Sequence, residues 1–175
     1  MASDPVLNHK PHAKTHNPPA YVTAFIKELL PIATQVKKTW GVPISVLIAQ
    51  GALESAWGQH VKGNAYFGIK GHTPSGGSVS FGTHEVYDGK SVAITDTFRA
   101  YSSLTDAADD YGRFLASNPR YRPCFAYSNQ PDHFVDALAA AGYATDPDYA
   151  AKLKGIIRHH NLAGYDVPNA ANKTK

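Results

Sequence analysis

Residues 43–57 constrain the fold most, because their helical spacing places apolar side chains around nearly the whole circumference of one helix. Pro43 suits the first position of this helix, where its missing N–H removes no hydrogen bond. A helix that is apolar on every side is buried in a soluble domain. The sequence therefore predicts a central helix that other elements surround.

Amphipathic helices are predicted on both sides of this segment in the sequence. Residues 22–40 have helical apolar spacing, with Pro31 expected to kink the helix and Gly41 to end it. Three further helices are predicted, from the cap residue Ser103 to Asn118, over 131–141, and over 147–160 with Asp146 as the cap.

Between the helical segments the chain is rich in Gly and in β-branched residues. The pair Asp88-Gly89 lies between two strand-like segments, 83–87 and 90–98, and favours a type I′ turn because both positions need positive φ. The sequence therefore predicts an α+β fold, a mainly helical domain with one small β-hairpin lobe.

The 175 residues suffice for one domain with its own core. Residues 1–20 lack periodicity and are expected to form a disordered leader, residues 21–166 the folded domain, and residues 167–175 a flexible tail. No apolar secretion-signal segment is seen near the N-terminus, and no run of about 18 apolar residues occurs. We therefore expect neither membrane insertion nor signal-dependent export.

Cysteine content and charge exclude other classes of protein. The single cysteine, Cys124, excludes an intrachain disulfide and a cysteine-based zinc site, and we expect no metal and no other cofactor. The formal net charge is +3, but the Lys and Arg residues are scattered along the chain. No nucleic acid partner is expected.

Glu54 is the only charged residue of the apolar helix. Burial would raise the pKa of its carboxyl and keep it protonated near neutral pH, which is the state that a general acid needs. Gln50, one turn earlier, and Ser55 are possible hydrogen-bond partners. The alternative is that Glu54 occupies the one solvent-facing strip of this helix.

Glu85 is the second candidate acid, on the first strand of the predicted hairpin. A two-residue turn at 88–89 pairs Glu85 with Val92, on a mostly apolar face. Glycosidic hydrolysis uses two carboxyl groups, one that protonates the leaving oxygen and one that activates water or stabilises positive charge. An ordinary solvated strand glutamate is the alternative for Glu85.

Five further segments of the chain carry recognisable motifs: 52–58 (ALESAWG), 63–71 (GNAYFGIKG), 98–101 (FRAY), 118–121 (NPRY) and 141–150 (AGYATDPDYA). Together and in this order they resemble the bacterial peptidoglycan N-acetylglucosaminidase family, the glucosaminidase domain of flagellar-type and autolysin hydrolases. The resemblance covers roughly residues 25–166. It implies a lysozyme-like fold and endo-acting cleavage of the β-1,4 bond after N-acetylglucosamine in peptidoglycan.

The resemblance also implies roles for individual residues. Glu54 would be the general acid, Glu85 the second acid, and Tyr143 an active-site residue that orients the acetamide or water, with core packing as its alternative. Four residues are candidates for sugar binding or cleft lining, with core packing or turn capping as the alternative: Trp57, Asn64, Tyr66 and Phe67.

The biological setting is also inferred by resemblance. A compact single domain without a signal peptide is similar to type VI secretion glycoside hydrolase effectors. We therefore expect a monomer that is made in the cytoplasm, exported by a dedicated machine and active in the periplasm or cell wall. Its partners would be glycan strands and a periplasmic immunity protein that occludes the cleft. The alternatives are a phage endolysin, a lysozyme-like muramidase or lytic transglycosylase, and a non-catalytic glycan-binding module.

Overall fold

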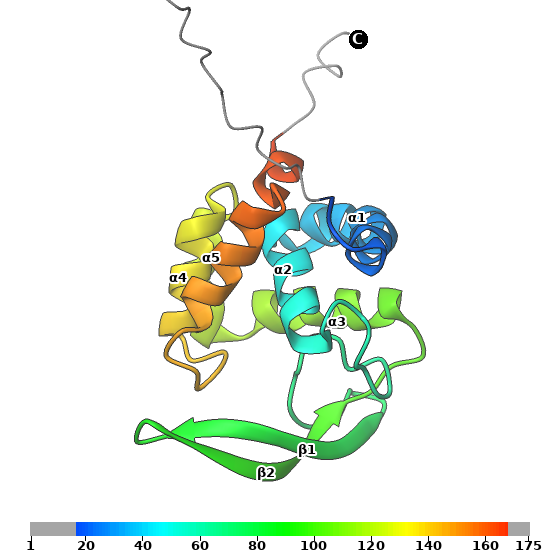
Figure 1. Cartoon of the computed structure of the whole chain (residues 1–175), viewed down its shortest axis with the longest axis vertical. Helices are drawn as coiled ribbons and strands as arrows, with labels where there is room; N and C mark the ends of the chain where they lie inside the picture. Colours follow the sequence, from blue (N-terminus) through cyan, green and yellow to red (C-terminus); the bar gives the residue numbers. More distant parts are fainter. Residues whose placement is uncertain (1–16, 168–175) are drawn as a thin grey trace, which may run out of the picture.

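The computed structural model describes residues 17–167 and has a helical lobe above a two-stranded hairpin (Figure 1). The α-helices are α1 (Ala20–Trp40), α2 (Ile44–Ser55), α3 (Leu104–Ser117), α4 (Pro131–Ala140) and α5 (Tyr149–His159). The strands are β1 (Ser78–Tyr87) and β2 (Lys90–Arg99), and the 3₁₀ helices are η1 (Pro119–Tyr127) and η2 (Leu162–Asp166). The predicted α+β class is confirmed. Most of the expected leader and tail lies outside the described residues.

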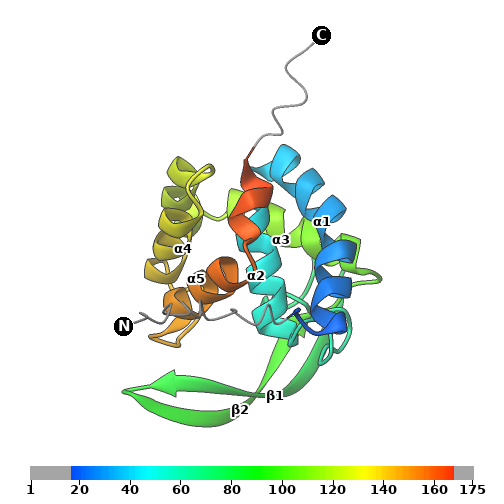
Figure 2. The same ribbon diagram turned by 45° about the horizontal axis from the view of Figure 1, so that its top comes forward.

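Helix α2 is the centre of the helical lobe. Every residue from 44 to 52 is buried, and α1, α5 and η2 pack against this helix. Figure 2 shows α2 between α1 and α5. At its N-terminal end the backbone N–H of Ser45 donates to Asp166 Oδ1 over 3.1 Å, which ties the end of the described chain to the core. The predicted central helix is confirmed.

The helix boundaries follow the local signals in the sequence with two exceptions. Helix α2 ends at Ser55, before the predicted end at Trp57, because Ala56 and Trp57 take positive φ. Helix α1 continues through Pro31 and ends at Gly41, which takes a φ of +85°. Ser103 caps α3 by accepting the N–H of Asp106 over 3.1 Å. The predicted start of the last helix is wrong: α5 begins at Tyr149, because the Asp146 carboxylate accepts the N–H of Asp148 and holds a turn before the helix.

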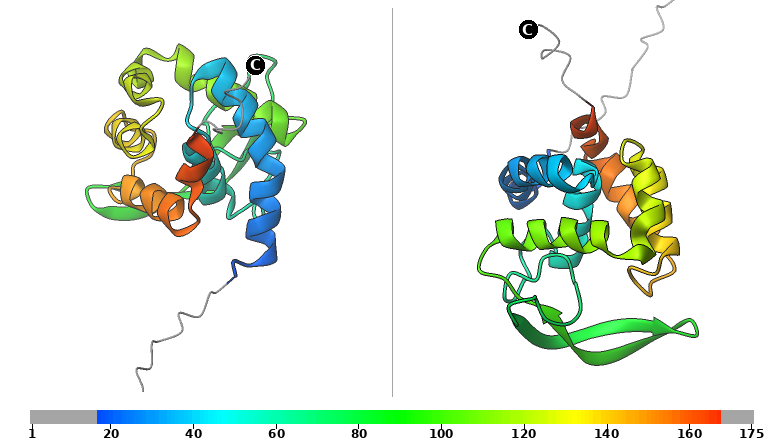
Figure 3. Two further views of the ribbon diagram at one scale, coloured as in Figure 1. Left: turned by 90° about the horizontal axis from the view of Figure 1, so that it is seen from above. Right: turned by 180° about the vertical axis from the view of Figure 1, so that it is seen from behind.

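The hairpin has the predicted turn and register. Asp88 and Gly89 have φ values of 49° and 72°, and Glu85 pairs with Val92. The strands extend further toward the hairpin base than predicted, to Ser78 and Arg99, since Gly82 is accommodated within β1. Figure 3 shows, from behind, α3 crossing above this hairpin. Within residues 17–167, none of the helices has the length and apolar character needed to cross a bilayer.

Candidate active site

A cleft of about 620 Å³ lies between the helical lobe and the hairpin. The lower end of α2, the hairpin and the loop between α4 and α5 converge on it (Figure 1). Glu54, Glu85 and Tyr143 all line this cleft. The fold therefore brings together three of the predicted site residues, which are as much as 89 positions apart in sequence.

Glu54 lies in the last turn of α2, where its side chain is exposed and faces the cleft. The expected full burial is wrong, because the one exposed strip of α2 opens into the cleft. The protein around the cleft still displaces water, and this desolvation raises the pKa of Glu54 to about 7. A hydrogen bond from Tyr149 works to lower this pKa, and the charge of Glu85 works to raise it. The carboxyl is therefore largely protonated below neutral pH, as a general acid must be.

The hydrogen-bond partner of Glu54 is Tyr149, whose hydroxyl donates to Glu54 Oε1 over 3.2 Å. Gln50 reaches the acid only through Tyr149, since its Nε2 donates to the tyrosine oxygen over 2.9 Å. Ser55 does not contact the carboxyl in any hydrogen bond of the described chain. Its hydroxyl donates to the Gly51 carbonyl over 2.6 Å and accepts the N–H of Gly58 over 2.8 Å. Ser55 thus holds the turn that ends α2.

Gly68 leaves room for the other oxygen of Glu54. A Cβ built on Gly68 would lie 2.8 Å from Glu54 Oε2, closer than real Cβ atoms approach. Gly68 also has a φ of +61°, a conformation that favours glycine. The close approach of Glu54 and the positive φ both explain why position 68, in the segment 63–71 that carried the family resemblance, is a glycine.

Glu85 is held by charged and polar neighbours. Lys70 Nζ lies 2.8 Å from Glu85 Oε1 and 2.9 Å from Asp96 Oδ2, and the Thr145 hydroxyl donates to Glu85 Oε2. Partial burial works to raise the pKa of Glu85, but the hydrogen bonds from Lys70 and Thr145, with the charge of Lys70, outweigh it and hold this pKa below its ordinary value. Glu85 is therefore ionised at neutral pH.

Tyr143 lines the cleft with its hydroxyl already engaged. The hydroxyl donates to the backbone carbonyl of Phe67 over 2.5 Å, and the ring stacks on Tyr149 with centroids 5.9 Å apart. Tyr143 therefore braces Tyr149 from the side of the α4–α5 loop. Its role in orienting an acetamide or water stays a prediction.

The four candidate sugar-binding residues lie outside the lining of the cleft. Phe67 is 1% exposed and stacks on Tyr111 at 4.5 Å, so it has no surface to offer a sugar in this structure. Asn64 has a φ of +52°, and its amide donates to the Tyr101 carbonyl over 2.9 Å, which stabilises a turn.

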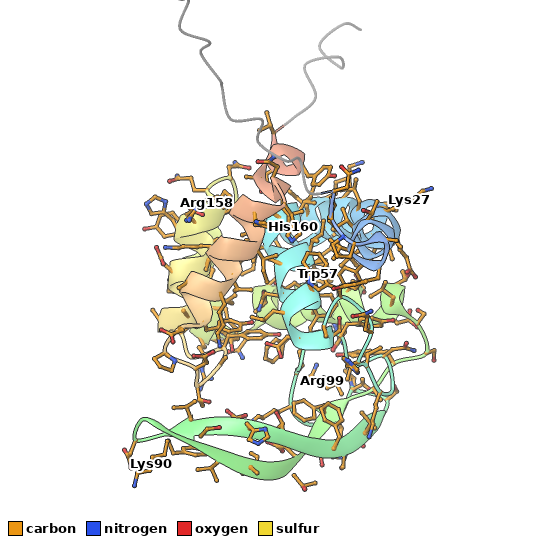
Figure 4. All side chains as sticks on the ribbon, viewed as in Figure 1. Lys27, Trp57, Lys90, Arg99, Arg158 and His160 are labelled. Atoms are coloured by element: carbon orange, nitrogen blue, oxygen red, sulfur yellow. The ribbon has the colours of Figure 1, made fainter. Side chains whose placement is uncertain are left out.

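Trp57 and Tyr66 form an aromatic cluster with Phe25. The ring centroid of Trp57 lies 5.9 Å from that of Phe25 and 4.7 Å from that of His160, and Figure 4 labels Trp57 and His160 on the helical lobe above the hairpin. Trp57 is near Glu54 in sequence but not in the cleft, because residues 56–58 all take positive φ and turn the chain away. Sugar contact by these two residues stays a prediction.

Sequence reasoning missed Lys70, Thr145 and Tyr149 as members of the site. Each lies within a segment that carried the family resemblance, 63–71 or 141–150. That was the available signal, since their spacing along the chain gives no hint of contact with either glutamate.

A family model described as Glucosaminidase, mannosyl-glycoprotein endo-beta-N-acetylglucosaminidase, matches residues 30–162. The chain belongs to this glucosaminidase family. It is 39% identical over 137 residues to the peptidoglycan hydrolase FlgJ of Vibrio parahaemolyticus, covering 74% of this chain and 44% of FlgJ. It is 35% identical to the exo-glucosaminidase LytG of Bacillus subtilis, covering 86% of this chain and 55% of LytG. The chain thus spans about half the length, or less, of these relatives.

Solved structures show the same lysozyme-like glucosaminidase fold. A peptidoglycan hydrolase mutant from Sphingomonas sp. A1 aligns with a TM-score of 0.72 at 33% identity, covering 81% of this chain and 96% of that one. A type VI secretion system effector-immunity complex from Pseudomonas protegens aligns with a TM-score of 0.57 at 16% identity, covering 83% of this chain and 94% of that one. The second likeness shows the fold alone.

Proposed function

We propose that this glucosaminidase-family chain is a glycoside hydrolase that cleaves the β-1,4 bond after N-acetylglucosamine within peptidoglycan strands. The observation that carries the proposal is a pair of carboxyl groups with opposite pKa shifts, Glu54 raised and Glu85 lowered, that line one cleft from two lobes. The names of the relatives, peptidoglycan hydrolase and exo-glucosaminidase, support the choice of substrate.

The two carboxyl groups divide the chemistry between them. Glu54 donates its proton to the glycosidic oxygen as the bond from that oxygen to C1 of N-acetylglucosamine breaks, which leaves positive charge on the sugar. Glu85 either stabilises this charge while the acetamide of the substrate assists, or takes a proton from the water that attacks C1. Both routes need an ionised Glu85, which its contact with Lys70 maintains.

Replacement of Glu85 separates the two routes. We expect Glu85→Gln to lower kcat roughly 10- to 100-fold, less than the loss of the acid itself, because acetamide assistance needs only charge stabilisation from this residue. A loss as large as that of Glu54→Gln would assign Glu85 as the base. An unchanged rate would remove it from the mechanism.

Product analysis tests the proposed bond. Purified peptidoglycan is digested, reduced with borohydride and hydrolysed in acid, with Glu54→Gln as the inactive control. We expect glucosaminitol, because the cut exposes the reducing end of N-acetylglucosamine. Muramitol would indicate a muramidase, anhydromuramic ends a lytic transglycosylase, and binding without products a glycan-binding module. Early release of long oligosaccharides would support endo action, whereas disaccharides alone would indicate exo action.

We further propose that this hydrolase is a toxin delivered to the periplasm of another bacterium and inhibited there by an immunity protein that occludes the cleft. The proposal rests on the similarity of a compact single domain to type VI secretion glycoside hydrolase effectors, and the position of Glu54 on the cleft wall explains how a partner could block proton donation. The test is expression with an added secretion signal in a susceptible bacterium. We expect lysis with the wild-type chain, none with Glu54→Gln, and protection by an exported product of the neighbouring gene. A neighbouring holin gene in place of a protecting protein would indicate a phage endolysin.

A further inference from the structure

Three buried polar side chains connect the core of the helical lobe to Glu54. The Tyr111 hydroxyl donates to Gln50 Oε1, Gln50 Nε2 donates to the Tyr149 oxygen over 2.9 Å, and the Tyr149 hydroxyl donates to Glu54 Oε1 over 3.2 Å. Gln50 and Tyr111 are 0% exposed. We call the three side chains, Tyr111 from α3, Gln50 from α2 and Tyr149 from α5, the relay. The relay crosses the centre of the helical lobe. Burying polar groups is costly unless each is paired, and an apolar core would avoid the cost.

The relay runs in one direction. The Gln50 amide has one carbonyl and one NH₂ group, and Tyr111 donates to the carbonyl, so the NH₂ group faces Tyr149. If the amide turned over, its carbonyl would take the hydrogen of Tyr149, and Glu54 would lose that donor. The buried Tyr111 hydrogen would also lose the one acceptor it has among the described residues. Tyr111 therefore fixes the direction of the last hydrogen bond to Glu54.

This direction distinguishes the two oxygens of Glu54. Oε1 accepts the Tyr149 hydrogen, so in the protonated carboxyl Oε1 is the carbonyl oxygen and Oε2 carries the acid proton. Oε2 lies beside Gly68, a residue that lines the cleft and has no side chain to cover it. The relay thus leaves the proton on the oxygen that has space next to it.

We propose that Gln50 and Tyr111 are positioning residues of the hydrolase, which act through Tyr149 to keep the acid proton of Glu54 on Oε2. Neither residue lines the cleft. The inference deepens the proposed function and rests on it only for the role of Glu54 as the acid. The packing of the rings supports it, since Tyr111 stacks on Phe67, whose carbonyl is bonded by Tyr143.

Other charged and titratable groups face Glu54 across the cleft and remain in place when the relay is changed. Glu85 acts on it from β1, and Tyr143 lies beside it on the α4–α5 loop. Six further charged or titratable side chains line the same cleft: Lys70, His84, Arg120, Tyr121, Asp146 and Lys152. A change in titration that follows the relay alone must therefore come from the hydrogen bond to Oε1.

The experiment is a double-mutant cycle with Tyr111→Phe and Tyr149→Phe, read as the pH profile of kcat and kcat/KM. Both substitutions keep the aromatic rings that stack on Phe67 and Tyr143. Loss of the donor raises the pKa of Glu54, so we expect the alkaline limb to move up by about half a pH unit or more in each single variant. We expect kcat to fall about tenfold with KM unchanged, because the proton is no longer confined to Oε2.

The decisive result is the double variant. If Tyr111 acts through Tyr149, adding Tyr111→Phe to Tyr149→Phe moves the limb no further. Additive shifts would overturn the proposal, as would a Tyr111→Phe profile identical to that of the wild type. Gln50→Leu removes the acceptor that would compete for the Tyr149 hydrogen, so Tyr149 still donates to Glu54 and the limb should stay near its wild-type position. Adding Tyr111→Phe to Gln50→Leu should then move the limb no further, and this second cycle keeps the test available if Tyr149→Phe folds poorly.

A second measurement needs no substrate and separates this inference from the proposed function. The ¹³C signal of the Glu54 carboxyl, assigned by its absence in Glu54→Gln, is titrated by NMR. We expect its midpoint to rise in Tyr111→Phe even if the substrate assignment is wrong, and an unmoved midpoint would overturn the inference. Tyr101→Phe is the matched control, because it removes a partly buried tyrosine hydroxyl that donates to Asp110 outside the relay. Tyr101→Phe should change neither the alkaline limb of the activity profile nor the midpoint of the Glu54 titration.

Discussion

The two carboxyl groups face one cleft from lobes of different construction. Glu54 ends a helix whose other residues are almost all buried, and its support is a neutral hydrogen-bonded relay inside the core. Glu85 lies on a two-stranded hairpin whose strand residues are almost all exposed or half-buried, and its support is the ion pair with Lys70, whose side chain is 48% exposed. The helical lobe favours the protonated acid, and the hairpin favours the charged one.

The contrast shows how one fold can keep two identical side chains in opposite states. In the helical lobe the shift comes mainly from the removal of water, which salt hardly affects. In the hairpin it depends on a partly exposed charge, which salt screens. The lobes are connected near Glu85 by Thr145, which also accepts the N–H of Val86 over 3.1 Å. The state of Glu85 is therefore the more sensitive to solution conditions.

The largest expected effect is that of Glu54→Gln. The amide keeps the shape of the side chain and still accepts the Tyr149 hydrogen, but it cannot donate a proton to the leaving oxygen. We expect peptidoglycan hydrolysis to fall by about 10³-fold or more, with the circular dichroism spectrum unchanged. Turnover near the wild-type rate in a folded variant would remove Glu54 from the acid role.

Gly68→Ala should have the next largest effect. The added Cβ would meet Glu54 Oε2 at 2.8 Å, and backbone shifts that relieve this contact misplace the acid proton. We expect a loss of about 100-fold in kcat. Gly71→Ala is the matched control, because Gly71 also has a positive φ, +99°, but no atom lies within 4 Å of the added Cβ. Equal losses in the two variants would mean that backbone strain, and not contact with Glu54, is the cause.

Lys70→Met tests the hairpin side of the comparison. Loss of the ammonium lets the pKa of Glu85 rise toward its ordinary value, so the acid limb of the pH profile should move to higher pH while the alkaline limb stays with Glu54. We expect a several-fold loss of activity at pH 5 and a smaller one at pH 7. Lys90→Met, at the tip of the hairpin (Figure 4), is the control and should change neither limb. If the alkaline limb moved in Lys70→Met, this would contradict the assignment of the acid limb to Glu85 and of the alkaline limb to Glu54.

Local features of both lobes could be predicted from the sequence. The all-round apolar character of residues 43–57 predicted the buried helix, and Asp88-Gly89 predicted the hairpin register that pairs Glu85 with Val92. These features depend on residues close together in the chain. The same is true of the Ser103 cap and the turn at Gly41.

Contacts between distant segments could not be predicted. Tyr149 is 95 residues from Glu54, and Thr145 is 60 residues from Glu85, and periodicity reports only the face of an element on which a residue lies. The spacing left open whether Glu54 is buried or on a solvent-facing strip, and it could not show the cleft beside Glu54, because other segments form that cleft. The start of α5 was missed because Asp146 forms a turn of its own ahead of the helix.

The smallest expected effect is on stability, and its sign differs between the two lobes. The pKa of Glu54 rises from an ordinary 4.5 to about 7 on folding, so the folded state binds this proton more tightly than the unfolded state does. The resulting stabilisation is fully present below about pH 4.5 and is lost as pH rises toward 7. Glu54→Gln removes this dependence, so its Tm relative to the wild type should increase from pH 4 to pH 8.

For Glu85 the pKa in the folded state is lowered. The stabilisation that its ionised carboxylate contributes is present above the ordinary pKa and is lost as pH falls through the pKa of the folded state. The relative Tm of Glu85→Gln should therefore decrease from pH 3 to pH 7. Parallel trends in the two variants, measured by thermal unfolding across this range, would show that the lobes do not hold their carboxyl groups in opposite states.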